Sequence, residues 1–452
     1  MRSRVRRTIS NTCFDLMARH DRLPGLRGRM DLVDAFLGRS RDRIVAHQDQ
    51  AARDLVAHAY ANVPYYRRVM EERGLAPKDV RGVADLPQLP YLTKDIIRAN
   101  YDDLFAGNIA PGDRHTSATG GTTGVRMEFA RDNSCLLPKE AALLNFARWA
   151  GWSIGEPLGI VWPAQMDFGE PPSRLGRVKN RLYRRVFRLE AHVMDAGIMT
   201  QMAARIRRQQ PKVLRGFVSP LYQLASFILV RGLEVRSPVG VISTGEPLQQ
   251  RQRQTIAKAF GCPVYDSYRS RELGPVGQEC GAGKGMHVND HGLYLESAEP
   301  ERGASVGELV ATDFYNYGMP FIRYRTGDYG RLDTAACACG RGTTRILEVA
   351  GRVFESFPTR DGRIIHTSAL VLDLVDEAPE PMGQIQVVQT GYEEFVISFT
   401  PEPPLSADLQ RYMTARLARI FGAGTRVEFR EVPAILPGPS GKVAFTRTSL
   451  RD

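Results

Sequence analysis

Residues 40–75 carry apolar side chains at the spacing of an α-helix. Ile44, Leu55, Val56, Ala59 and Tyr60 recur along one face, and the pattern breaks at Asn62-Val63-Pro64. The spacing predicts a helical segment that is interrupted just before Pro64, because proline cannot continue the hydrogen-bond ladder of a helix.

A second stripe runs from Arg174 to Leu189, with apolar residues at 175, 178, 182, 186 and 189 and seven basic residues between them. This spacing predicts an amphipathic helix. Two interpretations stay open: a core-facing stripe with a solvated basic back, or a basic helix that lies on a membrane or docks a partner.

Between Val213 and Ser270 the pattern alternates between short β-like runs and helical stretches. The strand over 239–243 leads into Thr244-Gly245-Glu246, a helix is expected over about 247–260 with Gly261 ending it, and 264–268 form the next strand. This rhythm predicts an α/β fold with a largely parallel sheet.

The last hundred residues change character, because the runs over 384–388 and 394–398 alternate like strands of a small α+β domain. We place a domain boundary near Gly351-Arg352. The predicted organisation is a large N-terminal domain over 1–350, whose residues 1–40 form a basic leader or helix, and a small C-terminal domain over 351–452.

The composition is that of a globular protein, with 43% hydrophobic and 25% charged residues in 452. It excludes wholesale disorder, collagen and a disulfide scaffold, and the length suggests about two to four domains. The formal charge of +11 favours an anionic partner such as a nucleotide, a phosphorylated cofactor, nucleic acid or anionic lipid. Eight arginines lie in residues 1–30, which form either a solvated leader or a contact with a membrane surface.

No signal peptide is visible at the N-terminus, and the most apolar run, 221–230, is about half the length of a membrane span. The expected location is therefore the cytoplasm, with peripheral membrane contact through the basic N-terminus left open. Nucleic-acid binding is the least favoured function, because the positive charge is dispersed rather than striped with aromatic residues.

Four short motifs carry residue types suited to nucleotide chemistry. A hydroxyl-rich glycine loop can bring backbone amides close to phosphate, although no Walker lysine follows it. A tyrosine can stack on a base, a carboxylate at a strand end can hold Mg²⁺ or ribose hydroxyls, and a lysine on a glycine-flanked turn can reach into a site. In order these are Thr119-Gly120-Gly121-Thr122-Thr123-Gly124, Tyr268-Arg-Ser-Arg-Glu272, Tyr324-Arg-Thr-Gly-Asp328 and Ser440-Gly-Lys442.

The order of these motifs resembles the adenylate-forming superfamily, and specifically its phenylacetate–CoA ligase-like branch, which includes capsule-locus (CapK-type) proteins. Further stretches that resemble the branch are 61–66, 89–94, 211–222, 243–248, 307–312 and 339–341, so the resemblance covers about residues 45–445.

The resemblance implies a two-step reaction. A carboxylate attacks the α-phosphorus of ATP and releases pyrophosphate, and the acyl-adenylate then reacts with a second nucleophile, usually the thiol of CoA. The expected cofactors are ATP, Mg²⁺ and CoA. Homodimers are common in the branch, so a homodimer also stays open.

The resemblance also implies a role for each motif residue, and every one is named here by its position. Thr119, Gly120, Gly121, Thr122, Thr123 and Gly124 would cradle the β- and γ-phosphates. Thr244, Gly245 and Glu246 would line the adenine pocket, Tyr268 would stack on adenine, Asp328 would hold the ribose, and Glu272 would ligate Mg²⁺. Arg352 would contact ribose or phosphate at the hinge, and Lys442 would bridge carboxylate and phosphate until the C-terminal domain rotates.

The sequence departs from the family pattern at two places. Arg269 stands where the family usually has a glycine after the tyrosine, and Arg271 adds a cation able to pair with Glu272. After Arg352 the chain reads Val353-Phe354-Glu355 where an aspartate is common. These departures leave open an AMP-forming ligase that transfers the acyl group to an amine or hydroxyl. The basic N-terminus and the basic stretch over 174–189 leave open a nucleotide-binding scaffold with reduced catalysis.

Three cysteines and one histidine have the chemistry of a structural zinc site. Six residues separate Cys280 from His287, and Cys337 and Cys339 follow later in the chain, a set that suits tetrahedral Zn²⁺ without an open position. A similar constellation recurs in the family branch. His291 is an alternative to His287, and the other interpretation is that the four residues are unrelated.

Overall fold

The computed structural model describes most of the chain. The residues described are 11–16, 18–19, 21, 23–118, 127–162, 180, 185–191, 194–235, 238–298, 306–352, 357–361, 364–365, 370, 374, 378–380, 382, 384–401, 404–436 and 446–450. Every structural statement below concerns these residues.

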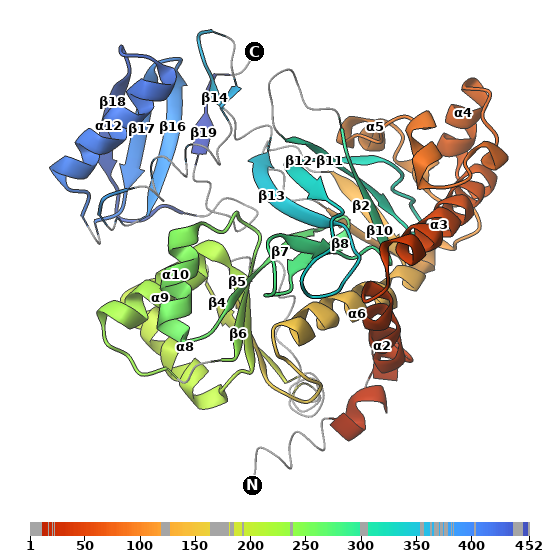
Figure 1. Cartoon of the computed structure of the whole chain (residues 1–452), viewed down its shortest axis with the longest axis horizontal. Coiled ribbons are helices and arrows are strands. Elements are labelled where there is room, and N and C mark those ends of the chain that lie inside the picture. The colour runs from red at the N-terminus through yellow and green to blue at the C-terminus, as the bar shows by residue number, and fades with distance from the viewer. Residues whose placement is uncertain are drawn as a thin grey trace.

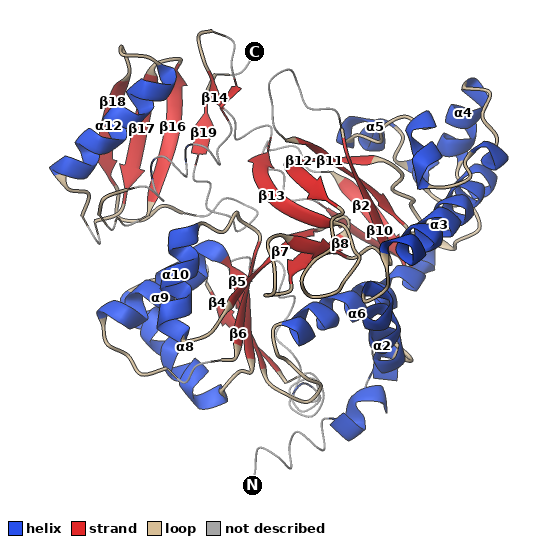
Figure 2. Cartoon of the chain, viewed as in Figure 1, coloured by secondary structure: helices blue, strands red, loops and turns tan. Residues whose placement is uncertain are grey.

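The main helices and strands follow one another in mixed order along the chain (Figures 1 and 2). The α-helices are α2 Leu26–Leu37, α3 Arg41–Asn62, α4 Pro64–Glu72, α5 Lys94–Ala99, α6 Asn133–Trp149, α8 Ala196–Gln209, α9 Val218–Val230, α10 Gln250–Phe260 and α12 Ala407–Phe421. The strands are β1 Arg114–Ala118, β2 Glu128–Asp132, β3 Leu158–Trp162, β4 Val186–Glu190, β5 Val213–Phe217, β6 Gly240–Thr244, β7 Val264–Ser270, β8 Gly274–Glu279, β9 Met286–Val288, β10 Leu293–Ser297, β11 Gly307–Asp313, β12 Tyr324–Asp333, β13 Arg345–Arg352, β14 Phe357–Pro358, β15 Ile364–Ile365, β16 Ile385–Gly391, β17 Glu394–Phe399, β18 Arg426–Glu431 and β19 Thr446–Thr448.

One sheet of eleven strands dominates the fold, in the order β10-β11-β12-β13-β9-β8-β7-β6-β5-β3-β4. The strands from β4 to β7 pair in parallel, and those from β7 to β10 pair antiparallel. The predicted α/β class is confirmed, and its parallel part is the half built from strand–helix–strand units.

The parallel half is covered on both faces. Helices α8, α9 and α10 pack on one face around Leu214, Leu221 and Ile256, and α6 with the N-terminal segment packs on the other around Val213 and Ile242 (Figure 1). Every residue of β6 is buried, as expected for a central parallel strand.

Two helix ends lie where the sequence predicts them. Helix α3 ends at Asn62 and α4 begins at Pro64, and α10 ends against Gly261, whose φ of 64° is the left-handed conformation favoured by glycine. Helices α3 and α4 pack on the antiparallel half of the sheet, where the Tyr66 hydroxyl donates to the carbonyl oxygen of Pro320 at 2.9 Å.

The C-terminal region forms a separate four-stranded sheet in the order β18-β17-β16-β19. Helix α12 packs on it, and the two share a core that includes Val387, Phe395 and Leu417 (Figure 1). The two strands expected over 384–388 and 394–398 are β16 and β17, which pair antiparallel.

Two expectations need correction. Residues 186–190 are not the end of a helix but the edge strand β4, because their backbone pairs in parallel with β3; most of the remaining stretch over 174–185 lies outside the described residues. The leader is not simply solvated, because Phe14, Ala18 and Leu26 are buried against α6. No helix in the described part of the chain is both long and apolar enough to cross a membrane.

Candidate active site

The carboxyl ends of β6 and β7 bring together two of the predicted motifs. Thr244 and Ser267 are partners in the parallel register, and the Thr244 hydroxyl donates to the Ser267 carbonyl oxygen at 2.8 Å. In open α/β sheets ligands bind outside the carboxyl ends of parallel strands, so these two motifs stand where a ligand is expected.

Gly245 has a conformation and surroundings that require glycine. Its φ is 84°, and a Cβ there would lie 2.7 Å from the Phe217 ring. The chain therefore passes very close to the end of β5. The next residue, Glu246, accepts hydrogen bonds from the backbone N–H and the hydroxyl of Ser219, both at 2.7 Å, which fixes its carboxylate at the first turn of α9.

Tyr268 and Asp328 lie 60 residues apart in the sequence and touch in the structure. The Tyr268 hydroxyl donates to Asp328 Oδ2 at 2.6 Å, and Asp328 is 8% exposed. Asp328 also faces Arg352 across the β12–β13 ladder, where only the backbone of Arg352 is described. Tyr268, Asp328 and the backbone of Arg352 thus lie together where β7 approaches the β12–β13 ladder.

Glu272 is buried, with 7% of its surface exposed. Its carboxylate accepts one hydrogen bond from a described residue. The Tyr324 hydroxyl donates to Oε1 at 3.0 Å, whereas Oε2 accepts no hydrogen bond from any described residue. Arg271 does not pair with Glu272 in the described structure; its Nη1 donates to the Ala118 carbonyl oxygen at 3.1 Å. The competition between Arg271 and Mg²⁺ for Glu272 that the sequence suggested is therefore not observed.

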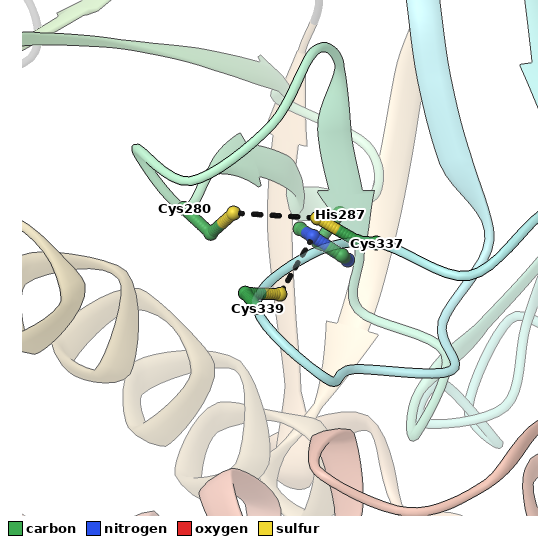
Figure 3. Close-up of side chains that lie close together, drawn as sticks. All are labelled: Cys280, His287, Cys337 and Cys339. Atoms are coloured by element: carbon green, nitrogen blue, oxygen red, sulfur yellow. Dashed lines mark hydrogen bonds between the residues drawn. The ribbon is translucent and has the colours of Figure 1, made fainter.

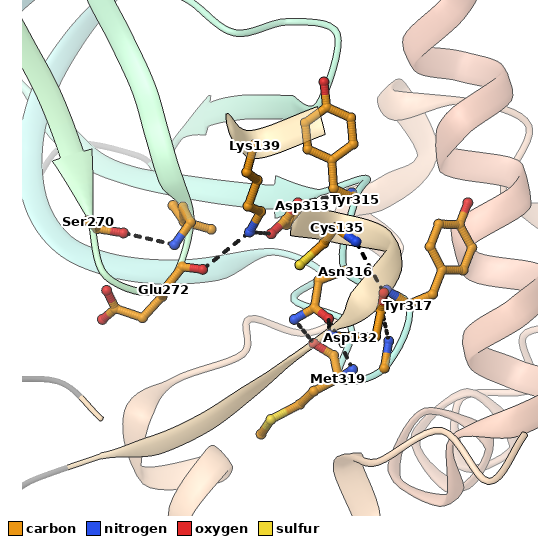
Figure 4. Close-up of polar contacts among 12 residues, drawn as sticks. Asp132, Cys135, Lys139, Ser270, Glu272, Asp313, Tyr315, Asn316, Tyr317 and Met319 are labelled. Atoms are coloured by element: carbon orange, nitrogen blue, oxygen red, sulfur yellow. Dashed lines mark hydrogen bonds and ion pairs between the residues drawn. The ribbon is translucent and has the colours of Figure 1, made fainter. Parts of the chain in front are cut away.

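Behind Glu272 lies a buried ion pair that the motifs do not reveal (Figure 4). Lys139 Nζ, on α6, lies 2.6 Å from Asp313 Oδ2 at the end of β11, and the side chains are 7% and 1% exposed. The same ammonium donates to the Glu272 carbonyl oxygen at 3.4 Å. The pair therefore joins the helix, the sheet and the backbone of the predicted Mg²⁺ ligand.

A second polar network holds the turn before β12 against the start of α6 (Figure 4). Asp132 Oδ2 accepts from the backbone N–H groups of Tyr317 and Gly318 at 2.8 and 2.6 Å, while its Oδ1 caps α6. The Asn316 side chain donates to the carbonyl oxygens of Ala130 and Met319, both at 2.9 Å. This network fixes the segment that leads to Tyr324 and Asp328.

Lys139, Asp313, Asp132 and Asn316 were not predicted from the sequence. One signal was available: Lys139 follows the buried Cys135 by four residues, which places a lysine in the apolar stripe of a helix. Its partner could not be identified, because it lies 174 residues further along the chain.

Several predicted site residues lie outside the described residues. They are the loop residues Thr119, Gly120, Gly121, Thr122, Thr123 and Gly124, together with Lys442, the side chain of Arg352 and the departure Val353-Phe354-Glu355.

The four predicted zinc ligands lie together beside the active-site strands (Figure 3). Their ligand atoms all fall within 4.8 Å of one another, with 3.8 Å between the sulfurs of Cys280 and Cys337 and 3.3 Å between Cys339 Sγ and His287 Nε2. Tetrahedral zinc with Zn–S bonds of about 2.3 Å separates two sulfurs by about 3.8 Å, so the spacing fits this ion.

The surroundings of these four residues also suit a metal. The buried His287 has its pKa lowered to about 4 by burial, with Arg341 and Arg345 adding to the effect, so its imidazole is neutral. Its Nδ1 lies 2.6 Å from the Thr343 hydroxyl, which leaves Nε2 directed at the sulfurs. A Cβ at Gly283 would lie 2.9 Å from Cys337 Sγ, so this turn needs glycine.

His291, the alternative ligand, is not part of this cluster. Its Nδ1 lies 2.6 Å from the Tyr315 hydroxyl, and its ring packs against Phe36 and His47. Burial lowers its pKa to about 3, so it is a neutral residue of the core.

The chain thus combines a large mixed α/β sheet, a separate C-terminal sheet and buried carboxylates beside β7 and β12. No family model matches the chain. Phenylacetate–coenzyme A ligase of Thermus thermophilus is 28% identical over 365 residues, which cover 78% of this chain and 80% of the relative. Protein CapK of Staphylococcus aureus is 24% identical over 407 residues, which cover 89% of both chains.

Solved structures give the same fold. A 2-hydroxyisobutyryl-CoA ligase in the postadenylation state superimposes with a TM-score of 0.68 at 19% identity, over 90% of this chain and 89% of that chain. An anthranilate CoA ligase gives a TM-score of 0.51 at 15% identity, over 88% and 79% of the two chains. The predicted resemblance to the phenylacetate–CoA ligase-like and CapK-type branch of adenylate-forming enzymes is thereby confirmed.

Proposed function

We propose that this chain is an AMP-forming carboxylate ligase, which activates a carboxylic acid as an acyl-adenylate with release of pyrophosphate and then transfers the acyl group to the thiol of CoA. The observation that carries the proposal is that hydrogen bonds join β7 and the residues after it to β12, from Tyr268 to Asp328 and from Tyr324 to Glu272. Relatives named phenylacetate–coenzyme A ligase, up to 29% identical in sequence, support the same reaction.

The nucleotide would lie across the ends of β6 and β7 and beside Asp328 in the middle of β12. Asp328 is oriented by the Tyr268 hydroxyl so that its second carboxylate oxygen can accept from a ribose hydroxyl. The aromatic ring of Tyr268 would stack on adenine, and the turn Thr244-Gly245-Glu246 would line the adenine pocket.

Glu272 fits a ligand of Mg²⁺, because Oε2 accepts no hydrogen bond from the described residues while Tyr324 holds Oε1. A bound magnesium ion would neutralise charge on the ATP phosphates. Thr119 to Gly124 would donate backbone and hydroxyl hydrogens to those phosphates, Arg352 would add a cation at the hinge, and Lys442 would donate to the oxygens that gain charge as the acid attacks.

We propose further that residues 1–350 and 351–452 are two domains joined near Gly351-Arg352, and that the small domain turns between the half-reactions. The separate core around Val387, Phe395 and Leu417 supports this division, because it packs without residues of the large sheet. Rotation would withdraw Lys442 and admit the CoA thiol to the adenylate.

The cluster of Cys280, His287, Cys337 and Cys339 would hold one structural zinc ion. The distances among its ligand atoms support this role, and four protein ligands leave no position for a substrate. A cytoplasmic location, a homodimer and contact of the basic N-terminus with a membrane remain predictions.

Pyrophosphate release from ATP and Mg²⁺, measured across aryl, fatty and amino acids, tests the proposal. Each acid is assayed with CoA, with hydroxylamine as a surrogate acceptor, and with neither. A CoA-dependent thioester is expected. A hydroxamate with no effect of CoA would instead indicate an amine or hydroxyl acceptor. ATP binding without turnover of any acid would favour the scaffold, and failure to bind ATP would refute the nucleotide site.

A further inference from the structure

Four arginines gather on the face of the parallel strands that α6 covers. Arg188 in β4 and Arg215 in β5 are both register partners of Ile160 in β3, so they flank it on the same face of the sheet. Arg269 lies near the end of β7, and Arg131 lies just before α6. Arg131, Arg215 and Arg269 are half-buried, whereas Arg188 is exposed.

Most of this positive charge is uncompensated. Within the described part of the chain, Arg131, Arg215 and Arg269 make no hydrogen bond or ion pair through their side chains, and the Nε atoms of Arg131 and Arg215 are buried without a partner. Burial lowers the pKa of Arg269 to about 9, and the charges of Arg215 and Arg131 lower it further while Glu140 opposes them. Burial likewise lowers the pKa of Arg215.

One acid cannot balance this cluster, and partly buried charges without partners are costly. Apolar residues of similar volume would make the sheet face more stable than unpaired guanidinium groups do. The three unpaired arginines therefore indicate a ligand with negative charge, since guanidinium is the group best suited to bind carboxylate or phosphate through two hydrogen bonds.

The cluster adjoins the proposed active site. Arg269 lies between Tyr268 and Glu272 in sequence, and Arg215 precedes Phe217 by two residues on the same strand and face. The Phe217 ring lies against Gly245 and packs edge-on to Trp162, with 4.5 Å between ring centroids. An acid activated at the strand ends would extend past these two aromatic rings to the arginines.

We infer that the acid activated by this enzyme carries a second anionic group, carboxylate or phosphate, which Arg215, Arg269 and Arg131 bind. This inference rests on the proposed function and specifies the substrate class of the same site. Glu140 and Arg188 would complete the wall around that group.

Matched pairs of acids test the inference by pyrophosphate release. The pairs are 1,4-phenylenediacetic acid with its monoamide, glutaric acid with its monoamide, and 3-phosphonopropionic acid with butyric acid. A preference for the dicarboxylic acids indicates that the second group is a carboxylate, and a preference for the phosphonate indicates that it is a phosphate. We expect the dianionic member to be used at least about 10-fold better in kcat/KM, since charge-assisted hydrogen bonds are the stronger kind.

Arg215→Met and Arg269→Met should each raise the KM for the dianionic acid about 10-fold or more, with the KM for ATP little changed. Arg207→Met is the matched control, because Arg207 is exposed on α8, which packs on the other face of the sheet. Thermal unfolding of each variant verifies that it is folded.

Equal use of the neutral acids would overturn the inference while leaving the ligase function intact. A raised KM for ATP in the two variants would also overturn it, because the arginines would then serve the phosphates of ATP. If no acid is turned over, the proposed function fails on its own. In that case calorimetry measures whether the dianionic acids bind to the protein. Binding to the wild type that is lost in Arg215→Met supports the anion site. No binding to the wild-type protein refutes it.

Discussion

Lys139 is an exception in a chain that strongly prefers arginine, because only eight of its 61 basic residues are lysines. It is buried and paired with Asp313, and it also reaches the backbone of Glu272. An ammonium fits where a carboxylate and a carbonyl oxygen converge on one point, whereas the planar guanidinium needs a larger space. We therefore assign Lys139 to positioning Glu272 rather than to binding a ligand.

Lys139→Met should destabilise the protein by about 3–5 kcal/mol, because it leaves the carboxylate of Asp313 buried without its cation. Urea unfolding measures the loss. The double variant Lys139→Met/Asp313→Asn should recover part of it, since neither partner is then charged. If the double variant is no more stable than the single one, the loss arises from packing, and the ion pair is not its cause.

Asp266 gives the stability of the protein a dependence on pH. The half-buried carboxyl accepts from the Ser243 hydroxyl at 3.0 Å, while its neighbour Glu279 accepts two hydrogen bonds from Arg253, at 2.8 and 2.9 Å. Burial, with the charge of Glu279 added, raises the pKa of Asp266 to about 7.

Because the folded pKa lies above the unfolded one, folded Asp266 keeps its proton at a pH where the unfolded chain has lost it. The resulting stabilisation is full below about pH 4 and is lost as the pH rises to about 7. Asp266→Asn should therefore flatten the profile of unfolding free energy between these values and match the wild type near pH 4. Asp42→Asn, at an exposed position on α3, serves as the control. An unchanged profile in Asp266→Asn would contradict the assignment.

At the scale of elements, the cluster of Cys280, His287, Cys337 and Cys339 joins a hairpin, a loop and a helix. The Trp149 ring at the end of α6 packs edge-on to His287, with 6.2 Å between centroids, and the Arg341 guanidinium lies 4.2 Å over the same ring. The cluster therefore packs against the helix that also carries Lys139.

We expect one zinc ion per chain in the purified protein, measured by atomic emission. Chelation should remove about 3 kcal/mol of stability, the amount expected of a ligand present at about 100 times its Kd. Cys337→Ser should lose the zinc, whereas Cys262→Ser, at a cysteine outside the cluster, should retain it. Full zinc content in Cys337→Ser, or none in the wild type, would show that the cluster is not the site.

How far the sequence predicts an element depends on whether its signal is local. The ends of α3 at Asn62 and of α10 at Gly261 follow from proline and glycine chemistry, and both were predicted correctly. Strand β4 was missed because the pairing of residues 186–190 with β3 outweighs the helical spacing of their side chains.

The candidate site follows the same rule. Tyr268, Glu272 and Asp328 could be proposed from the sequence because they lie in short motifs whose order resembles that of a known family. The Lys139–Asp313 pair and the arginine cluster were missed because their members come from separate elements that only the folded sheet brings together. Residue types alone cannot indicate such partners.

At the scale of the whole molecule, the chain consists of a large mixed sheet and a small sheet with separate hydrophobic cores. One polar link between them runs from Arg251 Nη1 on α10 to the carbonyl oxygen of Glu380, at 2.9 Å. Motion between regions with separate cores is the default expectation unless a large apolar interface joins them. A side chain of the small region can therefore serve one half-reaction and be absent from the next.

Lys442 is the only lysine after position 284, and it lies in the small C-terminal region. If it donates to the phosphate and carboxylate oxygens during adenylation, Lys442→Ala should slow pyrophosphate release by about 10²–10³-fold, the loss that follows removal of one preorganised donor. Conversion of a presynthesised acyl-adenylate to the thioester by CoA should stay within a few-fold of the wild type, because the rotated region would no longer present residue 442.

Lys284→Ala is the matched control, since this exposed lysine belongs to the large region. Equal loss in both half-reactions would mean that the C-terminal region does not rotate between them. Loss in neither would remove Lys442 from the site altogether. The difference between the effects on pyrophosphate release and on thioester formation therefore tests the two-region architecture directly. In a single rigid arrangement Lys442 would stay in the site, so its removal would not slow one half-reaction and spare the other.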